Sequence, residues 1–310
     1  MDFGVHLPLI DFGGTPFSLE HLLNYAETAE QLGYGALSVN DHMLFSRPWL
    51  DGLTALAVVL PKTGQMTLAT TLALPIVRSP VALAKTLAAI DVLSGGRLMV
   101  GIGPGSSARD YAAVGIPFEE RWKRFDESVQ ALRALWRKDA SAFKGQFYDT
   151  EGITLEPSPI QQPSPPLWIG SWGSEAGLGR VARLADGWLA SGYNATPESF
   201  AQAWNTLGAK LQSAGKDPAL FPNALATMWF YVTDNRSEAD RIVREVLSPT
   251  LNRPESVLRD RLPIGSAEEC AEKLAAYRAA GAQRVFLWPV GDDLNQITIF
   301  QKRVAPLLLA

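Results

Sequence analysis

Residues 66–103 read MTLATTLALPIVRSPVALAKTLAAIDVLSGGRLMVGIG, and this stretch carries the pattern that decides the fold. A short apolar run at 66–72 predicts a strand, a longer apolar run at 80–93 predicts a helix, and a second short run at 98–103 predicts another strand. None of the short runs alternates cleanly between apolar and polar residues, which is typical of strands that are buried on both faces. The stretch therefore predicts one strand–helix–strand unit of a parallel sheet.

The same alternation of strands and helices continues on both sides of this unit. The first helix follows the N-cap residue Ser18, and a later one begins at the capping box from Ser266 to Glu269. A fourth long helix carries a stripe of large apolar side chains that we expect to face the core: Trp122, Phe125, Val129, Leu132 and Trp136. The remaining predicted strands cover residues 3–9, 36–40, 167–170, 187–190, 224–232 and 284–288.

Between about residues 140 and 166 the periodicity fails and prolines cluster. We interpret this segment as an ordered excursion between strands 4 and 5, with a local hairpin at 143–148. Eight strands, each followed by a helix, predict an α/β fold of the (β/α)8 TIM-barrel type, formed by residues 1–310 as a single domain. The alternative, an open sheet with a dinucleotide site, would need Gly-x-Gly-x-x-Gly after the first strand, which Gly13-Gly14 does not supply.

Composition excludes several classes of partner. The formal net charge is −4 and no cluster of Lys or Arg stands out, which argues against binding to nucleic acid or to an anionic membrane. The N-terminus lacks a basic region followed by an apolar stretch, and no segment has the roughly 20 apolar residues of a membrane span. We therefore expect a cytoplasmic protein.

In a barrel of this type the active site lies at the carboxyl ends of the strands. No lysine falls in a predicted strand, no trio of carboxylates follows successive strands, and His6, His21 and His42 lack zinc-site spacing, so we expect neither Schiff-base chemistry nor a metal. The strand ends carry glycines, hydroxyl groups and aromatic rings instead. Such a lining suits a large planar cofactor that brings its own reactivity.

Two glycine-rich turns and two histidines have more than one interpretation. Residues 170–174 could cradle an anion at a helix N-terminus or form an ordinary turn, and residues 101–107 leave the same choice open. Arg109, close to the second turn, would either add a fixed positive charge to the anion site or be an ordinary side chain in solvent. His42, with Asp41 beside it, would exchange a proton with a ligand or be structural, and His6 would be a buried core histidine or face the substrate.

Several motifs together resemble the bacterial luciferase-like monooxygenase superfamily. The most characteristic stretch is Ser94-Gly95-Gly96-Arg97-Leu98 running into Gly101-Ile102-Gly103-Pro104-Gly105. Further matches span nearly the whole chain in the order of the family: Asp41-His42, Gly115-Ile116-Pro117, Arg121, Gly145-Gln146-Phe147-Tyr148, Pro165 to Gly170 and Ala185-Asp186-Gly187-Trp188. The resemblance implies a (β/α)8 barrel, usually a homodimer, that binds reduced FMN or coenzyme F-420 at the carboxyl ends of the strands.

The resemblance also implies roles for individual residues. Thr70, Thr71 and Leu72 would back the cofactor ring, in some members across a cis non-proline peptide, and His42 would lie near the reactive centre of the ring. By the same similarity the cofactor tail and phosphate would contact Gly103, Pro104, Gly105, Ser106, Gly170, Ser171, Gly173 and Ser174. The substrate, a small organic molecule, would meet His6, Trp172 and Trp288.

One departure bears on the choice of cofactor. Relatives that use FMN often place an arginine for the phosphate after the fourth strand, where this chain has Pro104-Gly105-Ser106, and whether Arg109 substitutes for it stays open. The Gly-Pro-Gly turn is similar to the deazaflavin branch and favours hydride transfer with coenzyme F-420. The alternatives are a reduced-FMN monooxygenase supplied by a separate diffusible reductase, and a flavin-binding barrel without catalytic activity.

Overall fold

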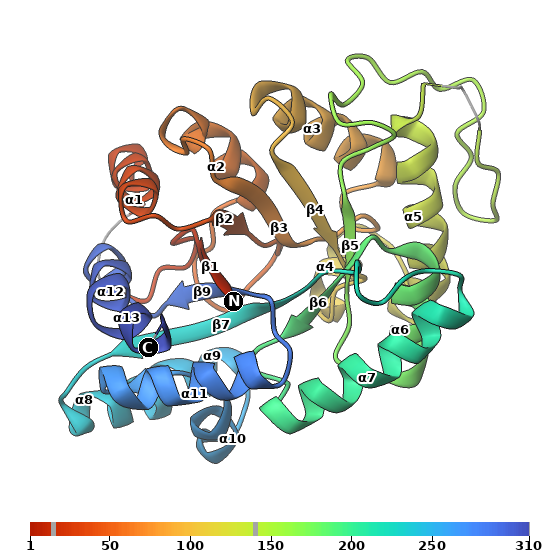
Figure 1. Cartoon of the computed structure of the whole chain (residues 1–310). Coiled ribbons are helices and arrows are strands. Elements are labelled where there is room, and N and C mark those ends of the chain that lie inside the picture. Colours follow the sequence, from red (N-terminus) through yellow and green to blue (C-terminus); the bar gives the residue numbers. More distant parts are fainter. Residues whose placement is uncertain (14–16, 139–141, 310) are drawn as a thin grey trace.

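A closed barrel of parallel strands surrounded by helices forms the centre of the protein (Figure 1). The computed structural model describes residues 1–13, 17–138 and 142–309. Within these residues, strands β1 to β6 pair in chain order, β9 pairs with β1, and β7 closes the ring by pairing with both β9 and β6. The eight barrel strands are β1 (Asp2–His6), β2 (Ala36–Val39), β3 (Thr67–Ala73), β4 (Leu98–Ile102), β5 (Leu167–Gly170), β6 (Gly187–Ser191), β7 (Asn223–Val232) and β9 (Arg284–Pro289).

The predicted (β/α)8 barrel is therefore confirmed, and each of its eight strands was expected from the sequence. The largest difference in bounds is at β1, which was predicted to reach residue 9 but ends at His6. Pro8 has no N–H to donate to a sheet, and the N–H of Leu9 instead turns back to the carbonyl of Leu7 at 2.8 Å. A ninth strand that the sequence analysis did not predict, β8 (Ile264–Gly265), pairs with Tyr231 and Val232 at the end of β7.

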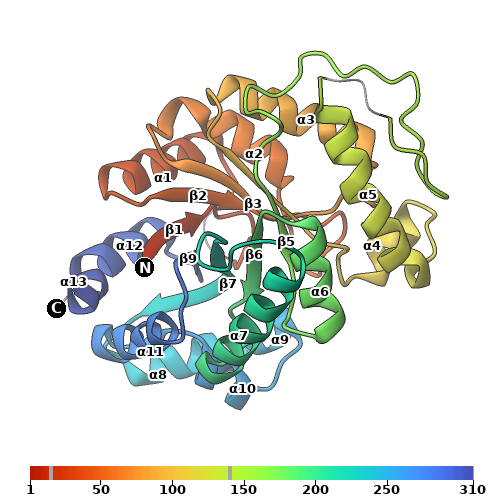
Figure 2. The same ribbon diagram turned by 45° about the vertical axis from the view of Figure 1, so that its right-hand side comes forward.

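Helices follow the strands and form the outer layer (Figures 1 and 2). The predicted N-cap at Ser18 and the capping box of Ser266 with Glu269 are both present. The α-helices are α1 (Leu19–Gln31), α2 (Gly52–Val59), α3 (Pro80–Leu93), α4 (Ala108–Ala113), α5 (Arg121–Trp136), α6 (Glu175–Leu184), α7 (Pro197–Ser213), α8 (Arg236–Arg241), α9 (Ser248–Leu251), α10 (Glu255–Arg261), α11 (Ala267–Ala279), α12 (Asp293–Ile299) and α13 (Ala305–Leu309). Short 3-10 turns, η1 (Leu60–Lys62) and η2 (Phe118–Glu120), and π-helical segments, η3 (Ile242–Leu247) and η4 (Phe300–Val304), complete the layer.

Two separate groups of buried side chains make up the core. The larger group lies between the strands and the surrounding helices. The smaller one contains residues of the strands alone, so it fills the interior of the barrel, where small alanines combine with the bulky Met99, Trp168 and Phe286. Because the interior is packed, a ligand can enter only at an end of the barrel.

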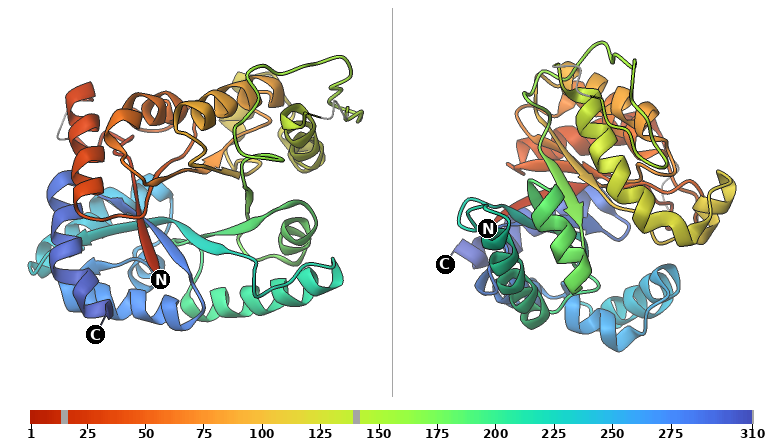
Figure 3. Two further views of the ribbon diagram at one scale, coloured as in Figure 1. Left: turned by 45° about the horizontal axis from the view of Figure 1, so that its top comes forward. Right: turned by 90° about the vertical axis from the view of Figure 1, so that its right-hand side faces the viewer.

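The predicted excursion between β4 and β5 runs over the outside of the barrel beside α3 and α5 (Figures 2 and 3). Its first residues, 140 and 141, lie outside the described residues. The predicted hairpin reduces to a single antiparallel bridge between Lys144 and Asp149. Further along, Asp91 on α3 accepts hydrogen bonds from the N–H groups of Ile160 and Gln161, at 2.8 and 3.1 Å, and so fastens the excursion to the barrel.

Among the described residues, the longest α-helix of the outer layer is α7, with 17 residues. In the part of the chain that the structure describes, no helix combines the length and the apolar character needed to cross a lipid bilayer.

Candidate functional site

A cavity of about 500 Å³ opens at the carboxyl ends of β2 to β7. This is the end of the barrel at which enzymes of this fold carry their active sites. Many of the predicted site residues line it: Asp41, His42, Thr71, Leu72, Pro104, Gly105, Ser106, Gly170, Ser171, Trp172 and Ser174. The strands therefore bring together groups that are up to 133 positions apart in the sequence, from Asp41 to Ser174.

The apolar side chain of Leu72 lines the cavity. The peptide bond between Thr71 and Leu72 is cis, the non-proline isomer that the family resemblance pointed to. A Cβ atom added to Gly103 or to Gly170 would come within 2.5 Å of Leu72 Cδ1. Glycine at these two positions therefore leaves room for the Leu72 side chain between two strand ends.

Thr70 contributes to the barrel wall. Its hydroxyl donates to the carbonyl of Gly101 at 2.6 Å, and a Cβ on Gly101 would lie only 2.1 Å from the carbonyl oxygen of Thr70. Thr70 thus joins β3 to β4 and does not line the cavity, although the sequence analysis placed it beside the cofactor ring.

Several groups that line the cavity are able to bind an anion. The turn after β5 leads into α6, whose N-terminal N–H groups and dipole favour negative charge. Ser174 caps the helix by accepting from the N–H of Gly177 at 3.2 Å, and Ser171 accepts from the N–H of Gly173 at 3.3 Å. Both hydroxyl groups still have a proton to donate to a ligand in the cavity.

Two arginines that were not among the predicted site residues line the same cavity. Arg121 is the first residue of α5, and its guanidinium lies over the ring of Phe118 at 4.0 Å. Arg180 on α6 pairs with Asp126 and lies 4.7 Å from the ring of Trp122. Arg109, the cation that the sequence suggested, is exposed and does not line the cavity.

Trp122 also corrects a prediction. It was expected to face the core with the other large side chains of its helical stripe, but 43% of it is exposed and it lines the cavity. Phe125, Val129, Leu132 and Trp136 are buried as expected. Trp122 lies in the first turn of α5, and its side chain lines the cavity instead of joining the core.

His42 is held by a buried carboxylate. Its Nδ1 lies 3.0 Å from Oδ2 of Asp110, whose Oδ1 accepts from the N–H of Leu44 at 2.8 Å. Because an ionised carboxylate only accepts, Nδ1 must carry the proton of this hydrogen bond, which leaves Nε2 to interact with a ligand. Asp110 was missed by the sequence analysis because it lies 68 positions from His42 and nothing in the local pattern links them.

Asp41, next to His42, has a structural partner. Its carboxylate binds Nε and Nη2 of Arg78 at 2.6 and 2.8 Å and accepts from the N–H of Leu74 at 3.2 Å, while Arg78 also bonds Asp51, the N-cap of α2. Burial alone would lower the pKa of Arg78, but the hydrogen bonds and charges of Asp41 and Asp51 raise it. The charge of Asp41 is thus balanced within the protein.

An aromatic wall adjoins His42. We define it as His6, Trp49, Trp229 and Trp288. His6, Trp288 and Trp229 lie on the neighbouring strands β1, β9 and β7, and their rings stack in that order at centroid distances of 3.5 and 3.9 Å. Trp49 meets Trp288 edge-on at 5.7 Å and lies 4.8 Å from His42. Burial lowers the pKa of His6 to about 3, so this ring is neutral at physiological pH.

The predicted residues therefore fall into three groups. Most line the cavity, as described above, and His6 and Trp288 belong to the aromatic wall. Trp172 is at the rim of the cavity with 61% of its surface exposed. Thr70, Gly103, Gly173 and Arg109 do not line the cavity, and neither do His6 and Trp288 of the aromatic wall. Lining residues that the prediction lacked include Asn40, Phe118, Arg121, Trp122, Arg180, Tyr193 and Thr227.

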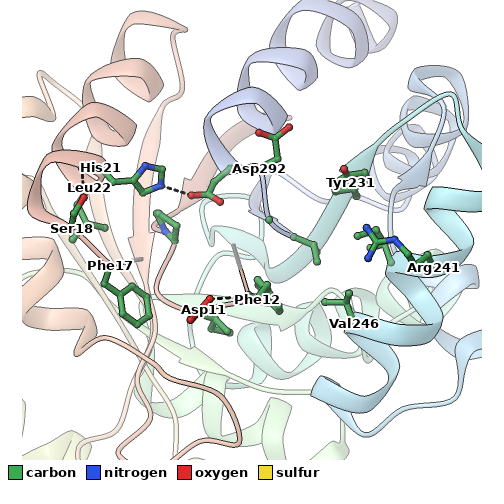
Figure 4. A pocket seen from close by; sticks show the side chains of 17 residues that line it. Asp11, Phe12, Phe17, Ser18, His21, Leu22, Tyr231, Arg241, Val246 and Asp292 are labelled. Carbon is green, nitrogen blue, oxygen red and sulfur yellow. Dashed lines mark hydrogen bonds and ion pairs between the residues drawn. The ribbon is translucent and has the colours of Figure 1, made fainter. Parts of the chain in front are cut away.

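A second cavity, of about 270 Å³, lies near the ends of β1, β7 and β9 (Figure 4). Its lining is rich in charge and includes Asp11, Arg241 and Asp292, and His21 pairs there with Asp293 at 2.6 Å. The two cavities share no lining residue. The first cavity is larger and holds most of the predicted site residues, so it is the better candidate for a large planar ligand.

Comparison with known proteins agrees with this geometry. The family described as "Luciferase-like monooxygenase" matches residues 1–254. Among solved structures, an F420-dependent secondary alcohol dehydrogenase superposes with a TM-score of 0.85 at 20% identity, covering 99% of this chain and 98% of that one. At this identity the likeness concerns the fold.

Curated relatives include proteins named for either of two cofactors. An FMNH(2)-dependent dimethylsulfone monooxygenase of Pseudomonas putida is 28% identical over 70% of this chain and 55% of its own length. An F420-dependent glucose-6-phosphate dehydrogenase of Kribbella flavida is 25% identical over 94% of this chain and 95% of its own length. The chain spans only about half of the first curated relatives that it matches, 54% of their length.

Proposed function

Because this chain belongs to the luciferase-like monooxygenase family, we propose that it is an oxidoreductase that binds coenzyme F-420 and catalyses hydride transfer to or from a small organic substrate. The observation that carries this proposal is the cavity itself. It combines the apolar side chain of Leu72, hydroxyl and guanidinium groups that can bind an anion, and His42. The F420-dependent relative that aligns over 94% of this chain supports the same choice.

The residues present fit such a cofactor. A deazaflavin or flavin has a flat ring system and an anionic tail, and when bound it accepts or gives the hydride. Leu72 would support the ring, and the turn Pro104-Gly105-Ser106 would follow the tail. The hydroxyl protons of Ser171 and Ser174, the N-terminus of α6 and the guanidinium of Arg121 would bind the phosphate.

His42 would move the proton in this reaction. Its Nε2 is free of the hydrogen bond to Asp110, and its ring is 4.8 Å from that of Trp49 in the aromatic wall. A substrate between the cofactor ring and the wall would exchange its hydroxyl proton with Nε2, and the carboxylate of Asp110 would stabilise the imidazolium that results. The packed interior of the barrel shields the other side of the site from water.

A reduced-FMN monooxygenase is the second candidate. The observation in its favour is that Arg121 and Arg180 line the cavity, since they could bind the FMN phosphate in place of the arginine missing after β4. The dimethylsulfone monooxygenase relative is of this kind by its name. A separate reductase would then supply the reduced flavin to the site.

One titration separates these candidates. Purified apo-protein is mixed with F-420 and, separately, with FMN, and binding is followed by quenching of the fluorescence of each cofactor. We expect micromolar or tighter binding of F-420 and at least about 10-fold weaker binding of FMN, a difference of about 1.4 kcal/mol. Tight binding of FMN alone would replace the first candidate by the second. Binding of neither would favour a barrel without flavin-type catalysis.

A further inference from the structure

Thr227 has an unusual backbone conformation at the point where β7 reaches the cavity. Its φ angle is 55°, in the left-handed region, which β-branched residues rarely adopt because of steric strain. The pairing of β7 with β9 shifts register between Leu225 and Met228, so the strand bulges around this residue. Bulges next to active sites often re-aim a side chain, and Thr227 lines the cavity. The strain therefore indicates that the Thr227 side chain has a function there.

The hydroxyl of Thr227 forms a pair with that of Ser191, at the end of the neighbouring strand β6. Their oxygen atoms are 3.2 Å apart, and Ser191 also lines the cavity. Thr227 donates its proton to the carbonyl of Ala226 at 2.7 Å, so its oxygen can only accept further bonds. Ser191 accepts from Nδ2 of Asn194 at 3.0 Å, which leaves its own proton for Thr227 or for a ligand. The pair thus offers a ligand one acceptor and one donor.

A hydroxyl group on a ligand complements this pair, and a methyl group does not. The ligand hydroxyl accepts the proton of Ser191 and donates its own to Thr227, and its ionised form keeps the first of these bonds. A methyl group in the same place would cover both oxygen atoms without forming a hydrogen bond. Sites that hydrogen-bond a hydroxyl group discriminate strongly against analogues without it, because their polar groups lose water and gain no partner.

The lining of the cavity differs between two opposite sides of the barrel. In the closed ring β2 and β6 are opposite, with β3, β4 and β5 between them on one side and β7, β9 and β1 on the other. Polar side chains lie at the ends of β2 and β3: Asn40, Asp41, His42 and Thr71. Besides the hydroxyl pair, β6 and β7 contribute the apolar side chains of Leu189, Ala190 and Ala226. A ring system with one polar end and one apolar end that carries a hydroxyl group matches both sides.

The two candidate cofactors differ in such a group. The outer ring of F-420 carries a hydroxyl group where that of FMN carries a methyl group, and both have a polar pyrimidinedione ring at the other end. We propose that Ser191 and Thr227 form the subsite for this ring hydroxyl, and that the pair makes the protein prefer F-420 to FMN. This inference rests on the proposed function. Asn194 is a positioning residue, because its bond to Ser191 directs the serine proton toward the ligand.

The first test uses two ligands that differ only at this position. FMN and its 8-hydroxy analogue, in which a hydroxyl group replaces one ring methyl group, have the same tail and phosphate. Isothermal titration calorimetry of the purified apo-protein should give a dissociation constant at least ~10-fold lower for the 8-hydroxy analogue. Equal binding of the two, or tighter binding of FMN, would overturn the proposal. So would a failure of the analogue to bind to a protein that binds F-420.

The second test removes the two hydroxyl groups one at a time. Ser191→Ala and Thr227→Val should each reduce the preference for the 8-hydroxy analogue over FMN by ~3- to 10-fold, the usual effect of one hydrogen bond. Thr227→Ser keeps the hydroxyl group and should keep the preference. Because the preference is a ratio of two ligands on one protein, a general loss of folded protein changes both dissociation constants alike.

Thr298→Val is the matched control for this test. The hydroxyl of Thr298 donates to the carbonyl of Leu294 at 2.7 Å, and Thr298 does not line the cavity. The control should therefore keep the full preference for the 8-hydroxy analogue. If Ser191→Ala and Thr227→Val discriminate between the ligands as well as the control does, the pair does not recognise the ring hydroxyl.

The F-420 titration separates this inference from the function on which it rests. An unaltered protein that binds neither F-420 nor FMN overturns the proposed function and the inference together. A protein that binds F-420 but does not distinguish FMN from its 8-hydroxy analogue overturns the inference alone.

Discussion

Nδ1 of His42 lies 3.0 Å from Oδ2 of Asp110, and this contact joins the end of β2 to the first turn of α4. Asp110 is only 1% exposed, and its second oxygen is occupied by the N–H of Leu44. The carboxylate therefore has no freedom to turn away. It fixes both the orientation of the imidazole and the nitrogen that carries its proton.

Asp110→Asn should impair the action of His42 without preventing the protein from folding. An amide oxygen can still accept from the N–H of Leu44, but it cannot stabilise a protonated His42 as a carboxylate does. We expect kcat to fall about 10- to 100-fold, as when the partners that orient metal-binding histidines are removed. The pH dependence of kcat should shift, and the dissociation constant of F-420 should not. An unchanged pH profile would contradict a positioning role.

His42→Ala should lower turnover far more than stability. Loss of a general acid–base group typically reduces kcat by about 10²- to 10⁴-fold, whereas a partly exposed side chain contributes about 1 kcal/mol or less to folding. His21→Ala is the matched control, since His21 is also partly exposed and also contacts a carboxylate, that of Asp293. Steady-state rates and thermal denaturation of both variants check this. Equal turnover of the two variants would remove His42 from the mechanism.

Arg121→Ala should weaken cofactor binding. A hydrogen bond to a charged group contributes about 1.5–3 kcal/mol, so the dissociation constant of F-420 should rise about 10- to 100-fold. Arg109→Ala should leave it unchanged, because Arg109 is exposed and does not line the cavity. Fluorescence titration measures both variants. If instead Arg109→Ala weakened F-420 binding and Arg121→Ala did not, Arg109 would be the residue that binds the anion, as the sequence first suggested.

Gly177→Ala should also weaken cofactor binding, for a steric reason. The added Cβ would lie 2.4 Å from the hydroxyl oxygen of Ser171 and 3.0 Å from that of Ser174, so both hydroxyls must move. Gly179→Ala is the control on the same helix, because its Cβ meets no atom within 4 Å and alanine favours the helix by up to about 1 kcal/mol. If Gly179→Ala also weakened cofactor binding, the effect would come from a change in the whole helix and not from displacement of the two serine hydroxyls.

His6 should make stability depend on pH. Its pKa is about 3 in the folded protein against 6.5 ordinarily, so between these values the unfolded chain binds a proton that the native protein does not. This contribution is fully present above pH 6.5 and is lost as the pH falls toward 3. Compared with His6→Phe, the protein should lose about 1.4 kcal/mol per pH unit between pH 6 and 4 in urea unfolding. Parallel curves for the two proteins would mean that His6 titrates normally.

The strands could be predicted because most of them consist of short apolar runs that stand out from the helical pattern around them. β8 could not, since two residues leave no periodicity to detect. The end of β1 was overestimated because apolar residues continue to Leu9 although Pro8 interrupts the pairing. Local patterns thus indicate where strands lie, but the hydrogen bonds of neighbouring strands decide where they end.

The candidate site was predictable where its residues follow strands directly, as His42 and the turn at 170–174 do. Arg180 was missed, and Arg121 was quoted as a family match without a role, because both lie on helices and their approach to the cavity depends on how α5 and α6 pack. The stack of His6, Trp288 and Trp229 depends on the closure of the barrel, which makes β1, β9 and β7 neighbours. The spacing of residues along the sequence does not reveal that these three strands are neighbours.

The anion-binding groups and the aromatic wall come from different strands: α6 follows β5 and α5 follows β4, whereas the wall rises from β1, β7 and β9 and from the loop after β2. The two sets of side chains are therefore carried by different segments of the chain. On the proposed function, side chains at the ends of β7 and β9 could therefore be exchanged while the groups proposed to bind the coenzyme keep their places.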